Sequence, residues 1–200
     1  MSDHAAREEA IIATALDLAE SRGVAGVTTA ALARHLAFTE AALYRYFPSK
    51  GAIIAATLRH LGNRLFATMM LELMPDAVGH GHAIQPQLER HIKRFMLRNG
   101  LLVELLLSAV GGREEELQAT GFDFLQSYGE RMTEYFRQLH ALDQLVASAP
   151  PSELARLWVC QLLGGFVAAR LAREGWDPVR HPGFQAFVAN LRTSGATAHN

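Results

Sequence analysis

The chain has 200 residues, of which 50% are hydrophobic and 20% are charged, so it can bury a core and is not a disordered tail. Nineteen Lys and Arg residues stand against 20 Asp and Glu residues, a formal net charge of −1, which excludes a globally basic nucleic-acid-binding surface but not a local basic face. Cys160 is the single cysteine, which excludes an internal disulfide and a cysteine-based zinc site.

Neither a membrane span nor a secretory signal is expected. The longest charge-free apolar stretch lies between Arg156 and Arg170 and is too short to cross a bilayer. The N-terminal residues MSDHAAREEA are acidic and lack the basic-then-apolar order of a signal peptide. These features predict a cytoplasmic protein.

Apolar residues recur with helical spacing along almost the whole chain, and no strand-like alternation of any length is present. A first helix is expected from about residue 5 to Arg22, with Gly23 as its C-terminal stop. Two short helices are expected over Thr28–Leu36 and Glu40–Tyr46, and a long one from about Lys50 to Leu73.

Pro75 and the Gly- and His-containing residues after it end this long helix. The apolar run Gly100–Val110 is expected to be buried, and the acidic run Glu114–Glu116 to lie at the positive end of the next helix dipole. Further helices are expected to begin near Ser152 and at Pro182. The sequence therefore predicts an all-α fold of about nine helices.

The two short helices have the layout of a helix-turn-helix. Thr28 and Thr39 each precede an apolar-periodic run, where a hydroxyl can cap the free N–H groups of a helix. Each threonine follows an apolar residue that can pack on another five positions further along the chain. Because helices this short are unstable alone, they are expected to pack on the first helix. The residues expected to make this contact are Leu32, Leu36, Leu43 and Phe47.

The second short helix carries the residue types of a DNA-reading helix. Small side chains at Ala41 and Ala42 would let it enter a major groove, and Arg45 could donate to a phosphate or a guanine. Ser49 is expected to cap the long helix, so that Lys50 and the free N–H groups there can meet a phosphate.

The charge of this segment is locally positive. Over residues 28–59, Arg34, Arg45, Lys50 and Arg59 oppose Glu40 alone, a net charge of +3. A concentrated positive face suits a small DNA-binding module. On spacing and charge alone, the same residues could equally form the surface of an ordinary three-helix unit.

A resemblance adds to this interpretation. The block EAALYRYFPSK, residues 40–50, resembles the N-terminal signature of TetR/AcrR-type bacterial regulators, and the likeness covers roughly residues 8 to 56. Further matching positions precede this block at Gly23, Thr28, Leu32, Ala33 and Thr39. Beyond residue 56 only length, helix count and helix order agree.

The resemblance implies an all-helical homodimer with a three-helix DNA-binding domain at residues 1–49 and a regulatory and dimerisation body at residues 50–200. The recognition helix would span Glu40–Tyr46. Residues matching those that touch phosphates in the family are Thr28, Thr39, Tyr44, Tyr46 and Lys50. Residues matching the part that faces bases are Glu40, Ala41, Ala42 and Arg45.

One position departs from the family pattern. The glycine usual in the turn of the helix-turn-helix is Ala37 here. A left-handed backbone at an alanine costs on the order of 1 kcal/mol, so the geometry of this turn is an open question at the level of sequence.

Small residues line one stripe of the helix that begins near Ser152. Such a stripe is explained either by tight packing within one chain or by a dimer seam, and the resemblance favours a seam with the final helix. The seam is expected to comprise Gly164, Gly165, Ala168, Ala169, Phe184 and Val188. Such a dimer would hold two recognition helices about 34 Å apart and bind a palindromic site.

Aromatic and methionine side chains of the body could line an apolar effector pocket, although each is equally explained as core. The candidates are Phe66, Met69, Met70, Phe95, Met96, Phe124, Tyr128 and Trp158. No residue pattern identifies a ligand.

The function expected from all this is a nucleoid-associated transcriptional regulator, a repressor that binds double-stranded DNA as a homodimer and is released by a small molecule. The alternative is a DNA-bound adaptor for a cell-division protein, because Arg98-Asn99 and the helix-turn-helix are similar to the nucleoid-occlusion branch of the family. No metal is expected, since His80, His82 and His91 have no matching carboxylates nearby. No enzymatic activity or cofactor is expected either, because no Ser or Cys has a base at an activating spacing and no glycine-rich phosphate-binding loop follows a strand.

Overall fold

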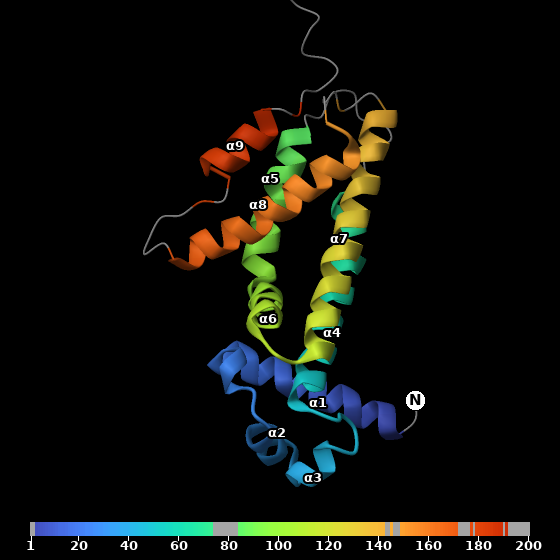
Figure 1. Cartoon of the computed structure of the whole chain (residues 1–200), viewed down its shortest axis with the longest axis vertical. Coiled ribbons are helices and arrows are strands. Elements are labelled where there is room, and N and C mark those ends of the chain that lie inside the picture. The colour runs from blue at the N-terminus through green and yellow to red at the C-terminus, as the bar shows by residue number, and fades with distance from the viewer. Residues whose placement is uncertain are drawn as a thin grey trace, which may run out of the picture. The chain divides into compact units, whose positions relative to one another are not determined.

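A computed structural model describes residues 3–73, 84–142, 145, 149–171, 177, 179–189 and 191 of the chain. These residues form nine α-helices, one 3₁₀ turn and no strand (Figure 1), which confirms the all-α prediction. In chain order the elements are α1 (Asp3–Arg22), η1 (Val24–Gly26), α2 (Thr29–Leu36), α3 (Glu40–Leu43), α4 (Lys50–Glu72), α5 (Ile84–Arg98), α6 (Gly100–Gly111), α7 (Glu115–Ala141), α8 (Pro151–Leu171) and α9 (Pro182–Ala189).

The chain divides into two compact units. The first comprises Met1–Leu65 and Leu101–Phe124, and the second comprises Phe66–Gly100 and Leu125–Asn200. The domain boundary expected after residue 49 therefore lies inside the first unit. This unit extends further because the first turns of α4 are buried from Gly51 to Leu58.

The core of the first unit holds α1, α2 and α3 together. α2 contacts both α1 and α3, and the three lie together in Figure 1. Ile11 of α1, Leu32 of α2 and Leu43 of α3 have no exposed surface, and neither has Val27 before the cap of α2. Burying a leucine or isoleucine side chain stabilises by roughly 1.5–3 kcal/mol, so this shared core supports helices too short to persist alone.

The core of the second unit is built around Trp158 of α8, which has no exposed surface. Its ring centroid lies 6.2 Å from that of Phe184 and 5.8 Å from that of Phe187, both on α9. Phe187 also meets Phe136 of α7 edge to face, at 6.4 Å. Offset and tilted ring pairs at these distances are the favoured aromatic geometries, so α9 is fixed to the unit by its phenylalanines.

Among the described helices, α8 is long and apolar enough, by length and composition, to cross a membrane. In the structure one of its faces is buried in the second unit through Leu154, Trp158, Leu162 and Phe166. These side chains follow the spacing of a helix face that packs on a protein core.

Candidate nucleic-acid interface

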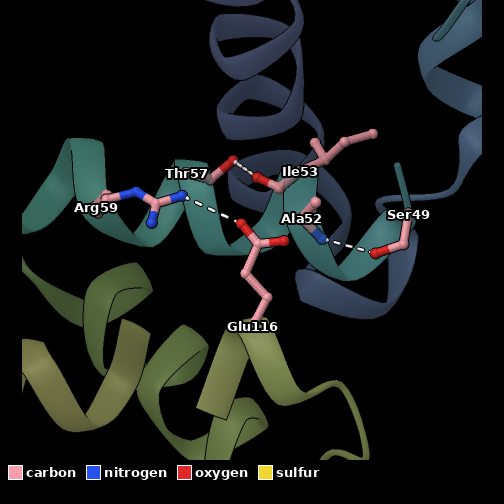
Figure 2. A network of polar contacts seen from close by, with 6 residues as sticks. All are labelled: Ser49, Ala52, Ile53, Thr57, Arg59 and Glu116. Atoms are coloured by element: carbon pink, nitrogen blue, oxygen red, sulfur yellow. Dashed lines mark hydrogen bonds and ion pairs between the residues drawn. The ribbon is translucent and has the colours of Figure 1, made fainter. Parts of the chain in front are cut away.

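Three hydroxyl caps fix where the helices of the interface begin. Thr28 and Thr39 each accept a hydrogen bond from the backbone N–H three residues later, at 3.1 Å in both cases. Ser49 accepts from the N–H of Ala52 at 3.0 Å (Figure 2). All three caps predicted from the sequence are confirmed, and together they fix the entry of the chain into α2, α3 and α4.

The turn between α2 and α3 is left-handed at Ala37, with φ 53° and ψ 38°. It is the single non-glycine residue with positive φ in the described part of the chain. Its N–H donates to the carbonyl of Ala33, and the N–H of Phe38 donates to the same oxygen at 2.8 Å. The turn is therefore left-handed although its residue is an alanine, at the cost of about 1 kcal/mol that a Cβ imposes there.

The α-helical part of the recognition segment is shorter than predicted. α3 ends at Leu43, and the residues expected to continue it to Tyr46 form a turn. The N–H groups of Arg45 and Tyr46 donate to carbonyls three positions earlier, at 3.3 and 2.9 Å. Such bonds tighten the end of a helix into 3₁₀-like geometry.

The recognition segment is anchored by one residue and otherwise faces outward. Leu43 is completely buried, whereas Tyr44 is 50% exposed and Arg45 is exposed. Of the other residues predicted to contact DNA, those that are exposed are Thr28, Thr39, Glu40, Ala41 and Lys50. Ala42 and Tyr46 are half-buried. The nine side chains are thus available on the surface of the first unit.

Tyr46 is held in a small ring cluster that sequence reasoning missed. Its centroid lies 4.9 Å from that of His4 on α1 and 6.3 Å from that of Phe38. The Arg7 guanidinium lies over the Phe38 ring, 5.6 Å from its centroid, in a cation–π arrangement. The N-terminal end of α1 therefore orders the tyrosine that was predicted to touch a phosphate.

A second missed contact joins the two helices of the motif. The hydroxyl of Thr29 donates to Oε2 of Glu40 at 2.6 Å. Thr29 is the first residue of α2, and Glu40 is the first of α3. Their 11-residue separation follows no local periodicity, so the folded motif was needed to find the pair.

Acidic residues at the N-terminal end of α7 contact the first half of α4. Oε1 of Glu116 lies 3.4 Å from Nη2 of Arg59 (Figure 2). A Cβ placed on Gly51 would lie 2.5 Å from Oε2 of Glu114, so this carboxylate lies directly against the first turn of α4. The run Glu114–Glu116 thus supports α4 as well as opening α7.

The candidate pocket residues are mostly packed side chains. Buried among them are Met69, Phe95, Phe124, Tyr128 and Trp158. Phe66 and Met96 are half-buried, and the side chain of Met70 lies outside the described residues. Phe124 belongs to the first unit and the rest belong to the second, so the set does not form one cluster within a single unit.

A polar triad that the sequence did not reveal lies within the aromatic core of the second unit. The Tyr128 hydroxyl accepts from Nε1 of Trp158 at 3.0 Å and lies 2.9 Å from Nε2 of His91. Burial raises the pKa of Tyr128 above its ordinary value of 10.0, and the hydrogen bond from Trp158 opposes this rise. A neutral phenol at this position can both accept from the indole and donate to the imidazole.

An open groove of about 410 Å³ lies between α7 and α8 in the second unit. Its lining includes Leu125, Thr133, Ala155, Val159 and Cys160. None of the residues proposed for an effector pocket lines it.

The predicted dimer seam divides into two kinds of residue. Phe184 and Val188 are 1% and 5% exposed within one chain, and Phe184 packs on Trp158 of α8. Both therefore have little surface left for a partner. Gly164 is exposed, and a Cβ added there would meet no atom within 4 Å, so internal packing does not require a glycine. Gly165, Ala168 and Ala169 are half-buried.

The outward face of α8 also carries apolar residues that the sequence analysis left out. Leu157, Val167 and Leu171 are 48%, 40% and 79% exposed, and Cys160 is exposed. With Gly164 they repeat every three or four residues along one face of the helix.

No metal-binding group of three or more His, Cys, Asp or Glu side chains is present in the described part of the chain. His80 and His82 lie outside the described residues.

A family model described as bacterial regulatory proteins of the tetR family matches residues 11–57. This match covers α2, α3 and all three hydroxyl caps. Within residues 11–57 the chain is therefore similar to the TetR family.

The similarity to a known relative extends over more of the chain. This chain is 32% identical over 135 residues to the nucleoid occlusion factor SlmA of Marinobacter nauticus, and the alignment covers 66% of this chain and 65% of that relative. The chain thus spans slightly less than two thirds of this relative's length.

Two solved structures share the fold. The crystal structure of the reduced form of E. coli NemR has a TM-score of 0.73 and 18% identity, covering 93% of this chain and 97% of that one. A TetR-family transcriptional regulator from Cytophaga hutchinsonii has a TM-score of 0.75 and 12% identity, covering 96% and 97%. At these identities the likeness is one of fold, and it agrees with the helix order of both units.

Proposed function

We propose that this protein is a transcriptional regulator that binds a palindromic site on double-stranded DNA as a homodimer. The observation that carries the proposal is the outward face of the recognition segment. Leu43 anchors α3 in the core, while Glu40, Ala41, Tyr44 and Arg45 are exposed. A helix suits insertion into a major groove when one face packs on the protein core and the opposite face carries small and hydrogen-bonding side chains.

Phosphate binding follows from the residues around this face. Lys50 is exposed at the first turn of α4, a helix of 23 residues whose free N–H groups favour an anion. Arg45 and the hydroxyl of Tyr44 are further exposed donors. Contacts of this kind set the position of a protein on the duplex without reading its sequence.

Dimerisation is proposed through the outward face of α8. Leu157, Gly164, Val167 and Leu171 supply an apolar stripe, and the unfilled space over Gly164 would admit a side chain of a second α8. Burial of apolar surface drives such association. A two-fold symmetric dimer would carry two identical recognition segments, as a palindromic site requires.

We infer further that the regulator is a repressor released by a small molecule bound in the second unit. The open groove between α7 and α8 suits such a ligand, because its surface is largely apolar and carries a few polar side chains such as Thr133. The unit would adopt two arrangements that differ in the protein's affinity for DNA. A ligand that binds the low-affinity arrangement more tightly would release the DNA, and the size of the effect would follow from the difference between the two arrangements. Binding to duplex DNA would make the protein nucleoid-associated.

A second candidate function is a DNA-bound adaptor that binds a cell-division protein. It is favoured by the similarity to a nucleoid occlusion factor. It is also favoured by exposed apolar side chains on α6 and α7 of the first unit, where Val110 is 78% and Phe122 67% exposed. Large exposed apolar side chains such as these are candidates for contact with a protein partner.

The two lysines of the chain provide a matched test of the DNA-binding face. Lys50 lies at the proposed interface, whereas Lys93 is exposed on α5. Duplexes selected from a random library would be titrated by fluorescence anisotropy at several salt concentrations. We expect Lys50→Ala to weaken binding to every duplex and to reduce the salt slope by about one per lost phosphate contact, and Lys93→Ala to leave both unchanged. Equal behaviour of the two variants would refute the assigned face, and a wild-type protein without preference for any duplex would refute the regulator.

Mapping the sites occupied on the chromosome separates the two candidate functions. A local repressor is expected at one or a few promoters, including that of its own gene. An adaptor is expected at many dispersed sites that avoid the replication terminus.

A further inference from the structure

The contact between Thr29 and Glu40 gives the recognition segment a fixed carboxylate. The Thr29 hydroxyl donates to Oε2 of Glu40 at 2.6 Å, a short distance typical of a hydrogen bond to a charged acceptor. Because the two residues open α2 and α3, the bond restrains the Glu40 side chain from a neighbouring helix. A restrained side chain loses less conformational entropy when it binds a ligand.

The other carboxylate oxygen of Glu40 remains available. Oε1 makes no hydrogen bond or ion pair with any described residue, and the side chain is exposed. The residues that follow it, Ala41 and Ala42, contribute methyl groups that compete for no donor. Glu40 therefore presents a hydrogen-bond acceptor in a fixed direction. The side chains of Ala41 and Ala42 beside it are small enough to let the helix approach base edges.

An ionised carboxylate accepts hydrogen bonds and donates none, and this selects among the four bases. In the major groove guanine presents two acceptors, and thymine presents one acceptor and a methyl group. Adenine presents an amino donor beside the N7 acceptor, which would repel the second carboxylate oxygen. Cytosine presents the N4 amino donor with no acceptor of its own beside it.

We propose that Glu40 determines part of the DNA sequence preference by accepting a hydrogen bond from the N4 amino group of a cytosine in each half-site. Thr29 is a positioning residue for this contact, because it holds Oε2 and leaves Oε1 to the base. The inference rests on the proposed DNA-binding function and adds to it the identity of one recognised base and the residue that orients its reader.

The test is selection of bound duplexes from a random library, followed by affinity measurements on duplexes that differ at the cytosine alone. We expect the wild-type protein to select one cytosine per half-site. Glu40→Gln should lower the preference for that cytosine about tenfold, the size of a well-formed base contact. It should also move the preference toward adenine, whose N6 and N7 groups match an amide. Glu20→Gln, an equivalent change on the exposed surface of α1, should leave the selected sequence unchanged.

Variants at position 29 test the positioning role separately. Thr29→Val removes the hydroxyl and keeps the branched shape, and we expect it to lower the cytosine preference about threefold. Thr29→Ser should restore the preference, since it restores the donor. Thr14→Val is the matched control, because the Thr14 hydroxyl donates to the backbone within α1.

The outcomes are distinguishable. If the wild-type and Glu40→Gln proteins select the same sequence with the same strength, the base-reading role of Glu40 is overturned while DNA binding stands. If Thr29→Val keeps the full cytosine preference, Thr29 is not a positioning residue. If the wild-type protein selects no sequence, the proposed function itself fails and this inference fails with it.

Discussion

Arg59 on α4 and Glu116 in the first turn of α7 form an ion pair within the first unit, with Nη2 3.4 Å from Oε1 (Figure 2). Their side chains are 56% and 46% exposed. Ion pairs this exposed contribute roughly 0–1 kcal/mol, because water and salt screen them and both side chains lose freedom. We therefore expect Arg59→Ala to lower the free energy of unfolding by less than about 1 kcal/mol in urea titrations. Raising the salt concentration should shrink even that difference, and a larger, salt-independent loss would contradict this estimate.

Close packing holds the same two helices together more strongly. A Cβ on Gly62 of α4 would lie 2.8 Å from Cδ2 of Phe124 on α7. Overpacking a filled core costs about 1–3 kcal/mol, so Gly62→Ala should lower the free energy of unfolding by that amount. The control is Gly129→Ala, where an added Cβ meets nothing within 4 Å. This change should stabilise the protein by about 0.5–1 kcal/mol, because alanine is the better helix former. Equal effects of the two substitutions would show that the contact with Phe124 is unimportant.

The left-handed turn residue offers a stabilising substitution. Ala37 is exposed and has φ 53°, so replacing it by glycine removes strain and loses little buried surface. We expect Ala37→Gly to raise the free energy of unfolding by about 0.5–1 kcal/mol, after the larger entropy of glycine in the unfolded chain is subtracted. The same substitution at Ala13, exposed in the middle of α1, should destabilise by about 1 kcal/mol. Destabilisation by both would mean that the turn is not strained.

The buried phenol of Tyr128 makes stability sensitive to alkaline pH. Its pKa is raised by burial, so the stability that depends on the neutral phenol is complete below pH 10 and is lost as the pH rises toward the folded-state pKa. Above pH 10 the loss attributable to this group is about 1.4 kcal/mol per pH unit. Denaturant titrations between pH 8 and 11 should therefore show a shallower decline for Tyr128→Phe than for wild type.

Two further measurements attribute this loss of stability at alkaline pH to Tyr128. At neutral pH, Tyr128→Phe should be less stable than wild type by about 1–3 kcal/mol, because Trp158 Nε1 loses its acceptor. Tyr44→Phe, which alters an exposed phenol, should follow the wild-type pH dependence. If Tyr128→Phe has the wild-type slope, the hydroxyl does not remain protonated in the folded protein at those pH values.

The outward face of α8 gives a test of assembly. We expect Leu157→Glu to reduce dimerisation by at least tenfold in sedimentation equilibrium, since it introduces a charge into the proposed apolar seam. Leu97→Glu on α5 is the matched control, because Leu97 is 85% exposed and lies outside the seam. A dimer constant that responds to Leu97→Glu and not to Leu157→Glu would move the interface away from α8.

The sequence predicted those parts of the interface whose structure depends on residues close together in the chain. The caps at Thr28, Thr39 and Ser49 each depend on an amide three positions away. The left-handed backbone of Ala37, by contrast, was settled only by the structure. The predicted extension of α3 to Tyr46 was wrong because the N–H groups of Arg45 and Tyr46 bond three residues back instead of four.

The missed contacts depend on the folded core. Thr29 reaches Glu40 across 11 positions, and the triad of His91, Tyr128 and Trp158 joins three helices. Likewise, Phe184 and Val188 are apolar and periodic, a pattern that fits a dimer seam as well as a chain interior. Only the packing of α9 on α8 distinguishes the two.

Leu43 is the single side chain of α3 that is buried, which has a consequence for how such a protein can change. Its outward neighbours are exposed and bury little apolar surface, so they can be exchanged while Leu43 keeps the helix in place. New preferences for DNA sequence can therefore arise through single substitutions during evolution. A library randomised at Glu40, Ala41, Tyr44 and Arg45 should likewise retain a high fraction of folded members, from which regulators of altered specificity can be selected.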